Sequence, residues 1–252
     1  MAFTHLHVHT EYSLLDGSNK IKEYVRRVKE LGMDSAAITD HGVMYGVIDF
    51  YKACRAEGIR PILGCEVYVA PNSRFDKELT GGDDRYYHLV LLAENNTGYN
   101  NLTRIVSRGF TEGYYYKPRV DMELLQEFHE GIIALSACLA GEVQRYITKG
   151  LYDEAKKTAL KYQACFGKGN YFLELQDHGL PEQKMVNTAL LQMSKELDIP
   201  LVATNDVHYT YKEDVKPHDI LLCLQTGKKL ADEDRMRYVG GQYYVCLLYT
   251  SP

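Results

Sequence analysis

The amino-acid sequence predicts an α/β barrel, in which parallel strands form the inner layer and helices the outer one. Apolar runs of strand length alternate with amphipathic runs of helix length along most of the chain. Repeated strand–helix units favour parallel strands covered by helices. About seven such units point to a closed barrel rather than an open sheet. The length of 252 residues fits one barrel of this kind.

The predicted elements follow one another in a regular order. The first helix is the clearest, because Tyr24, Val25 and Val28 lie on one face and Gly32 ends it. The predicted strands are 3–8, 35–39, 61–69, 88–92, 131–136, 171–175 and 201–204. The predicted helices are 21–31, 47–56, 101–107, 141–147, 152–166, 182–197 and 215–224. The polar segment 72–85 is predicted to be a surface loop.

Composition restricts the function and the location. The net charge of −5 argues against a surface covered in basic groups, so contact with nucleic acid needs a local patch or bound cations. The six cysteines form no C-x-x-C pair, which argues against a zinc ribbon. There is no evident signal peptide and no run of eighteen apolar residues. We therefore expect a cytoplasmic protein with reduced thiols and no membrane partner.

Two histidines of the first predicted strand indicate a metal site. His7 and His9 are two positions apart, so the alternation of a strand places both on the same face. In a barrel that face is the inside, where two imidazoles can hold one metal ion. His5 shares this parity but lies nearer to the start of the strand, and is the weaker candidate.

Metal-binding residue types recur at the ends of other strands. Glu66 lies within the third strand, whereas Cys138 follows the fifth. Cys138 and Asp16 are weak signals on their own, since buried cysteine is commonly a small hydrophobe and aspartate is common in turns. In α/β barrels the active face lies at the carboxyl ends of the strands. A multinuclear metal site is therefore predicted from His7, His9, His41, His88, Asp206 and His208, and phosphoester hydrolysis is the activity that we expect of it.

Longer stretches resemble the PHP (polymerase and histidinol phosphatase) domain at the N-terminus of bacterial DNA polymerase III alpha subunits. These stretches are 5–17, 37–42, 61–66, 115–119, 175–179 and 203–209, in the order typical of that family. The stretches at 115–119 and 175–179 point to the polymerase branch of the family. We expect residues 1–245 to form one PHP domain. Residues 246–252 depart from the family pattern, and one interpretation of this atypical tail is a truncated gene model.

The resemblance implies a distorted seven-stranded (β/α) barrel with a metal cluster at the C-terminal ends of the strands. It implies two to three divalent metal ions, with zinc favoured over manganese or iron by mixed imidazole, carboxylate and thiolate ligands. The implied ligands are His7, His9, Glu66 and Asp206 for the first ion, Glu66, His88 and Cys138 for the second, and Asp16, His41 and His208 for the third.

The activity implied by the resemblance is 3'–5' exonuclease proofreading of the primer strand during DNA replication. Metal ions would activate the attacking water, so no protein nucleophile is predicted. The implied partners are the 3' end of a DNA primer, the remaining polymerase domains of a longer chain and other replisome subunits. The fragment lacks the polymerase catalytic domains, so nucleotide transfer is not expected from it alone.

Four further residues are predicted to contact substrate. Tyr12 follows the H-x-H strand, and His178 belongs to one of the stretches that resemble the polymerase branch. Lys117 and Arg119 lie in a tyrosine-rich stretch, and such a combination can hold single-stranded DNA. The alternative for this stretch is a docking surface for other polymerase domains. The polar surroundings of His218 predict that it lies in solvent.

Three other functions stay open at this point. A stand-alone phosphatase of the histidinol-phosphate type would use the same ligands. An amidohydrolase also begins with an H-x-H pair in a barrel, although Glu66 and Cys138 argue against it. A non-catalytic module that stabilises the polymerase is the third alternative.

Overall fold

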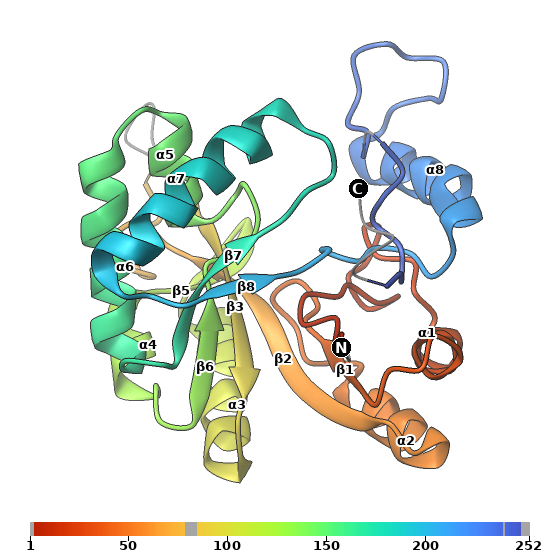
Figure 1. Cartoon of the computed structure of the whole chain (residues 1–252), viewed down its shortest axis with the longest axis horizontal. Coiled ribbons are helices and arrows are strands. Elements are labelled where there is room, and N and C mark those ends of the chain that lie inside the picture. Colours follow the sequence, from red (N-terminus) through yellow and green to blue (C-terminus); the bar gives the residue numbers. More distant parts are fainter. Residues whose placement is uncertain (1–2, 79–84, 239, 248–252) are drawn as a thin grey trace.

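The computed structural model describes residues 3–78, 85–238 and 240–247. A curled, mixed sheet forms the centre of the molecule and helices cover its outer side (Figure 1). The α/β fold class predicted from the sequence is confirmed. Within the described part of the predicted loop 72–85, no helix or strand is present, as expected. No helix among the described residues is long and apolar enough to cross a membrane.

The strands occur in a different spatial order from their order in the chain. Their bounds are β1 (Ser35–Ile38), β2 (Arg60–Val69), β3 (Tyr87–Ala93), β4 (Tyr114–Tyr115), β5 (Lys117–Val120), β6 (Ile132–Leu135), β7 (Tyr171–Leu175) and β8 (Leu201–Ala203). The sheet runs β4-β5-β2-β3-β6-β7-β8, and β1 pairs with the first part of β2. The two short strands β4 and β5 were not predicted.

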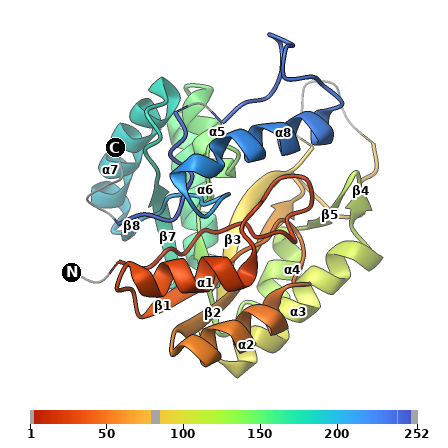
Figure 2. The ribbon, with the colours of Figure 1, turned by 90° about the vertical axis from the view of Figure 1, so that its right-hand side faces the viewer.

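The helices fall into groups around this sheet. Their bounds are α1 (Ile21–Glu30), α2 (Val47–Glu57), α3 (Asn96–Thr111), α4 (Met122–Glu127), α5 (Glu142–Thr148), α6 (Tyr152–Phe166), α7 (Pro181–Leu197) and α8 (Val215–Thr226). Helices α1 and α2 pack side by side (Figure 2). Helices α5, α6 and α7 form a second group that packs on β3, β6 and β7 (Figure 1).

The first predicted strand is not a regular strand. The segment 3–8 makes one isolated bridge, between Val8 and Val207, rather than a continuous ladder. On one side the amide of Thr39 donates to the carbonyl of Val8, at 2.9 Å. On the other side the amide of His9 donates to the carbonyl of Val207, at 2.7 Å. This segment therefore links β1 to the chain that follows β8, and it closes a distorted ring.

The prediction of a purely parallel sheet is wrong at β3. This strand runs antiparallel to both β2 and β6. A parallel neighbour needs a long crossover that usually contains a helix, whereas the predicted surface loop 72–85 precedes β3. The reversal places His88, near the start of β3, opposite Tyr68, near the end of β2. His88 therefore lies at the same end of the barrel as the carboxyl ends of the parallel strands.

A glycine marks the point at which β2 changes its main partner. The residues before Gly64 pair with β1, and those from Gly64 onward pair with β3. A Cβ atom at Gly64 would lie 2.5 Å from the carbonyl oxygen of Leu91. Only glycine allows this close approach of two backbones without displacement.

Two large apolar clusters lie between the strands and the surrounding helices, away from the histidines inside the barrel. One cluster fills the space between the sheet and α3–α7, and includes Leu91, Ile105 and Leu190. A second cluster packs α1 and α2 against β1, with Tyr24 and Phe50 fully buried. Each large apolar side chain buried in this way stabilises the fold by about 1.5–3 kcal/mol. This packing holds the strands whose ends carry the polar cluster.

The tail beyond 245 is partly described. Cys246 is buried, and its carbonyl oxygen lies 2.9 Å from Nε2 of His5. Leu247 packs against the core cluster of α1 and α2. The first two residues of the atypical tail therefore have packed positions, which the sequence did not predict. The rest of that tail, 248–252, lies outside the described residues.

Candidate metal centre

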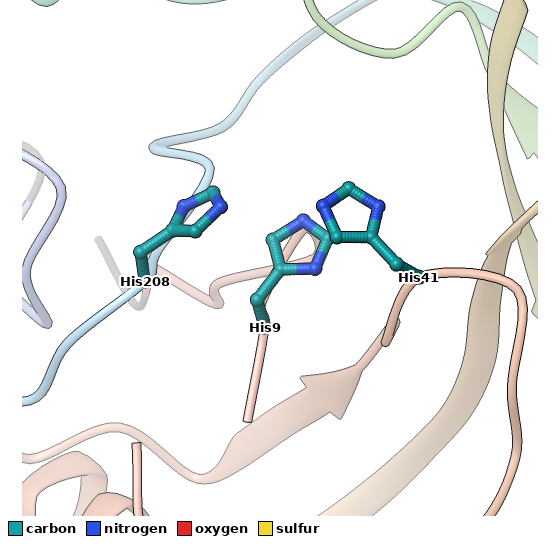
Figure 3. A group of neighbouring side chains, drawn as sticks. All are labelled: His9, His41 and His208. Carbon is teal, nitrogen blue, oxygen red and sulfur yellow. The ribbon is translucent and has the colours of Figure 1, made fainter. Parts of the chain in front are cut away.

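Polar side chains from separate strands and loops meet at one end of the barrel. His9 comes from the first extended segment, His41 follows β1 and His208 follows β8. The three imidazoles point toward one another (Figure 3). The complete group contains all nine predicted ligands, which are His7, His9, Asp16, His41, Glu66, His88, Cys138, Asp206 and His208.

The first part of the group surrounds the two histidines of the H-x-H pair. Nε2 of His7 lies 3.3 Å from Oε1 of Glu66 and 3.3 Å from Oδ1 of Asp206. Nε2 of His9 lies 3.2 Å from Oε2 of Glu66 and 3.2 Å from the same oxygen of Asp206. Both imidazoles are fully buried. Two imidazole nitrogens and two carboxylates thus converge on one small space.

Glu66 connects this part to the remaining histidines. Its Oε1 lies 3.0 Å from Nδ1 of His88, and its Oε2 lies 2.9 Å from Nδ1 of His41. The thiol of Cys138 lies 4.0 Å from Oε1 of Glu66 and 3.7 Å from Nδ1 of His88. One carboxylate therefore faces four histidines, which suits a ligand shared between cations.

Asp16 organises the outer part of the group. Its Oδ2 lies 2.7 Å from Nε2 of His41 and 3.3 Å from Nε2 of His208. The hydroxyl of Tyr238 lies 3.3 Å from Oδ1 of Asp16 and 3.1 Å from Nε2 of His208. Sequence reasoning missed Tyr238, because no strand pattern or motif marks its loop.

Several buried atoms of the group have no hydrogen-bond partner among the described residues. They are Nε2 of His7, Nε2 of His9, Nδ1 of His41, Oε2 of Glu66 and Oδ1 of Asp206. Leaving such atoms unpaired is unfavourable by about 1–3 kcal/mol each, and more when the group is charged. The imidazole nitrogens and the carboxylate oxygens point into the same small spaces. Divalent cations fit these donors, because imidazole, carboxylate and thiolate together match transition-metal preference.

Partners on the far side of the rings fix which nitrogen is free. Nδ1 of His9 lies 3.0 Å from the hydroxyl of Ser13, which itself donates to Asp40. Nδ1 of His208 lies 2.7 Å from the carbonyl oxygen of Asp206, which can only accept. Both rings therefore place the proton on Nδ1 and direct the Nε2 lone pair into the centre. Metal-binding histidines commonly have such outer partners.

The charges of the group shift one another's pKa values. Burial opposes ionisation of Glu66, but His88 and His7 outweigh burial and hold its pKa well below the usual range. Burial lowers the pKa of His41, yet Glu66 and Asp16 reverse the effect and raise it to about 10. The pKa of His9 is lowered by burial and by the neighbouring imidazoles. Histidine must be neutral to bind a metal, so bound cations would displace protons here.

Left-handed backbone positions lie beside the predicted site residues. Leu15 precedes Asp16 and has a φ of 63°, and Ala137 precedes Cys138 with a φ of 65°. Asp206 itself has a φ of 44°. Such conformations are unfavourable for these residue types by roughly 1–3 kcal/mol, and they concentrate at functional sites. The backbone is therefore strained at the positions where the chain turns the side chains of Asp16, Cys138 and Asp206 toward the metal centre.

The predicted substrate contacts separate into two pairs. Tyr12 and Lys117 line a groove of about 500 Å³ that opens from the centre. Arg119 does not line this groove, because its guanidinium is buried and donates to the backbone oxygens of Gly113 and Arg74. These contacts place Arg119 away from the groove, so the structure does not bring it together with Tyr12 and Lys117.

His178 is also placed away from the groove. It is buried, and its Nε2 lies 3.0 Å from the carbonyl oxygen of Asn205. Its ring stacks on Tyr243 with 3.8 Å between centroids. His178 therefore packs against the loop that carries Asp206, and the structure does not bring it into the groove.

Two other histidines also differ from expectation or lie outside the group. His218 is buried rather than solvated, and its Nε2 lies 2.7 Å from the carbonyl oxygen of Asp16. His5 is buried beside Cys246 and takes no part in the cluster, as its weaker standing suggested. The polar sequence around His218 hid its role, since only the folded chain brings α8 against the Asp16 loop.

A distorted α/β barrel with a His/Glu cluster that could hold metal ions defines the class of this molecule. Residues 5–178 match the family model of the PHP domain. The chain therefore belongs to the PHP domain family.

Relatives place the chain within one branch of that family. It is 51% identical over 245 residues to DNA polymerase III subunit alpha of Treponema pallidum, covering 97% of this chain and 21% of that protein. It is 48% identical over 250 residues to the same subunit of Deinococcus radiodurans, covering 96% and 19%. The corresponding protein of Thermus aquaticus is 44% identical over 248 residues, with 97% and 20% covered. The chain thus spans about a fifth of these relatives.

Solved structures support the fold. A candidate metal-dependent phosphoesterase from Bifidobacterium adolescentis has a TM-score of 0.51 at 15% identity, covering 81% of this chain and 87% of that one. An amidohydrolase from Chromobacterium violaceum with bound sulfate and no metal has a TM-score of 0.54 at 15% identity, covering 82% and 88%. At this identity the likeness concerns the fold alone.

Proposed function

We propose that the chain is a metal-dependent phosphodiesterase that removes nucleotides from the 3' end of a DNA primer strand. We further propose that it acts as the PHP domain of a longer DNA polymerase III alpha chain. The observation that supports this most directly is the convergence of buried, unpartnered nitrogen and oxygen atoms on shared spaces. A phosphodiester brings negative charge to such a place, which bound cations would offset.

Three overlapping groups of side chains would hold the ions. The first comprises His7, His9, Glu66 and Asp206; the second comprises Glu66, His88 and Cys138; the third comprises Asp16, His41 and His208. The thiol among these donors favours zinc, with manganese or iron as the alternatives. Divalent ions bound there would supply Lewis acidity that activates water and stabilises charge on the phosphate oxygens.

The side chains of the protein have separate tasks in this proposal. Glu66 spans the groups, since its two oxygens face different histidines. Ser13 and the backbone of Asp206 keep ligand rings in one tautomer. Full burial of His7 and His9 keeps bulk water from competing on the inner side of the centre. Tyr12 and Lys117 line the open side, where the substrate would enter.

The choice of DNA as substrate rests on the relatives and on the groove. The named relatives are polymerase subunits, and the sequence match extends over nearly the whole chain. A replicative role would place the protein in the cytoplasm, with the rest of the polymerase chain and other replisome proteins as partners. Nucleotide transfer would belong to those other domains. The same ligands would serve a histidinol-phosphate type of phosphatase, so substrate tests must separate the two activities.

The proposal is tested by metal analysis and a primer-shortening assay on the same purified protein. The expected result is at least two equivalents of bound transition metal and shortening of a 3'-labelled DNA primer. His9→Ala and Asp206→Ala should each abolish shortening. The exposed His129, whose Nδ1 lies 2.8 Å from the carbonyl oxygen of Gln126, provides the matched control His129→Ala.

Each unfavourable result has a distinct meaning. Absence of bound metal in the wild-type protein would refute the enzymatic proposal. Equal shortening by wild type and both variants would assign the activity to a contaminating nuclease. Release of phosphate from histidinol phosphate without primer shortening would favour the small-molecule phosphatase.

A further inference from the structure

We infer that the groove beside the metal centre binds the unpaired 3' end of a DNA strand by stacking its bases on exposed aromatic rings. This inference rests on the proposed function and specifies how the substrate is held. We call the rings the aromatic track, which consists of Tyr45, Phe110, Tyr114 and Tyr116. They come from the loop before α2, from α3 and from the β4–β5 hairpin.

The aromatic track and the metal centre share one groove. The groove of about 500 Å³ has Asp16, His41 and Glu66 in its lining together with the four rings. The ring centroids of Phe110 and Tyr45 are 6.5 Å apart. A DNA strand bound along the aromatic track would therefore have its 3' end close to the metal centre.

Three of the four rings of the track are highly exposed, and Phe110 is half-buried beside them. The exposed fraction is 61% for Tyr45, 57% for Tyr114 and 60% for Tyr116. Phe110 stacks beside Tyr114 at 6.3 Å with 30° between the ring planes. Clusters of exposed apolar surface mark binding sites more often than isolated exposed residues do. Flat rings of this kind offer faces on which bases of any sequence can stack.

Local backbone and charge both favour a nucleic-acid strand. Tyr116 has a φ of 61°, a left-handed position that turns the β4–β5 hairpin sharply. The guanidinium of Arg85 lies 4.4 Å from the centroid of the Tyr116 ring. Nζ of Lys117 lies 5.4 Å from the centroid of Tyr68, whose ring neighbours His88. Two cations thus accompany the track where phosphates would pass.

The groove lining would complement a polyanion once cations occupy the metal cluster, because it then keeps Lys117 and, among its described residues, no unoffset carboxylate. Among the described residues that line it, the only carboxylates are those of the metal cluster, which bound cations would offset. The lining includes Lys117, although the whole chain has a net charge of −5. DNA carries a row of negatively charged phosphates, whereas a protein surface elsewhere in the polymerase does not. Charge therefore favours DNA as the occupant over another polymerase domain.

The size of the groove favours a single strand. Cavities of about 300–1,000 Å³ hold one small molecule, so this groove has room for one or two nucleotides. Bases inside a duplex are already stacked and cannot meet the rings of the track. A paired primer end must therefore fray before it reaches the centre, and a mismatched end frays most readily.

Equilibrium binding tests this inference without any hydrolysis. Fluorescence anisotropy with a fluorescein-labelled phosphorothioate oligothymidylate, which resists hydrolysis while metal ions are bound, should show binding that a blunt duplex of equal length does not match. Tyr114→Leu and Tyr116→Leu should each weaken single-strand binding about tenfold, since leucine keeps apolar bulk but loses the stacking face. Lys117→Gln should reduce the salt dependence by about 0.7 in logarithmic slope. Tyr51→Leu, at an exposed tyrosine of α2, provides the control.

Hydrolysis of a small substrate separates this inference from the proposed function. Bis(p-nitrophenyl) phosphate is too short to reach along the track, so its hydrolysis reports on the metal centre alone. The wild type and the control Tyr51→Leu should hydrolyse it at the same rate, whereas His9→Ala should not. Unchanged oligothymidylate binding by both tyrosine variants would overturn the track and leave the metal centre standing. Equal affinity for duplex and single strand, or no binding by the wild type, would also overturn it. Binding with no hydrolysis of either substrate would refute only the proposed function.

Discussion

Glu174 holds His7 in one orientation from behind the metal centre. Oε1 of Glu174 lies 2.7 Å from Nδ1 of His7, and both side chains are inaccessible to solvent. A carboxylate can only accept, so the proton of the ring lies on Nδ1. Nε2 of His7 faces the carboxylates of Glu66 and Asp206 at 3.3 Å each, so this nitrogen carries a second proton unless a metal ion takes its place.

We predict that Glu174→Gln weakens metal binding by about 10–100-fold, as loss of an outer partner commonly does. Glutamine keeps the shape and contacts of the side chain with Gln176 and Thr204 but loses the negative charge. Competition with a chromogenic chelator measures the affinity, and circular dichroism verifies the fold. Glu196→Gln is the control, because Glu196 is exposed on α7 and accepts from Gln192 and Lys156. Equal affinity of Glu174→Gln and wild type would show that Glu174 is structural only.

Removal of bound metal should destabilise the fold. The centre places several buried carboxylates and imidazoles together, and an ion that binds only the folded state stabilises it. At a metal concentration about 100-fold above the dissociation constant, this stabilisation is about 2.7 kcal/mol. For a chain of this length we expect a fall in Tm of roughly 5–10 °C on chelation. Differential scanning fluorimetry with zinc and with a chelator measures it; identical Tm values would argue against a bound ion.

Metal binding should release protons near neutral pH. The carboxylates overcome burial and raise the pKa of His41 to about 10, and they raise that of His7 well above its usual value. Both rings therefore carry a proton at pH 7, which a metal must displace, so affinity should increase as the pH rises toward 10. Calorimetric titration in two buffers of different ionisation enthalpy counts these protons. A heat that does not depend on the buffer would contradict the predicted protonation.

Two glycines should respond to alanine with opposite signs. Gly64→Ala should destabilise the fold by about 1–3 kcal/mol, because the new methyl group would meet the carbonyl of Leu91 at 2.5 Å. Gly109→Ala should stabilise it by about 0.4–1 kcal/mol, since α3 offers an ordinary contact with Val120 at 3.4 Å and alanine favours the helix. Urea unfolding measures both. A stable Gly64→Ala would show that β2 and β3 separate easily.

Apolar periodicity was a sound guide to most helices and strands. α1 and α7 begin and end within one residue of their predicted bounds, because long amphipathic runs leave little ambiguity. The hairpin of β4 and β5 was missed, since two and four residues are too few to show alternation. The direction of β3 was also missed, because apolar pattern carries no information about which neighbour a strand joins.

Some residues of the candidate site were predictable from the sequence and others were not. His7, His9, Asp206 and His208 are evident from short motifs, because strand periodicity fixes which side chains share a face. Glu66 and Cys138 needed the family resemblance, as each is ambiguous alone. Glu174 and Tyr238 were invisible, since their roles depend on contacts across 167 and 30 residues of the chain. Outer partners of this kind leave no local pattern in a single sequence.

The metal content of Glu66→Gln compared with wild type tests the central claim most directly. Glu66 faces four histidines, so its isosteric replacement should affect more than one ion while leaving the apolar core intact. Elemental analysis should find two to three equivalents of transition metal in the wild type. The variant should lose at least one equivalent, together with primer shortening. A wild-type protein with no bound metal, or a variant that keeps the full content, would contradict a shared multinuclear centre.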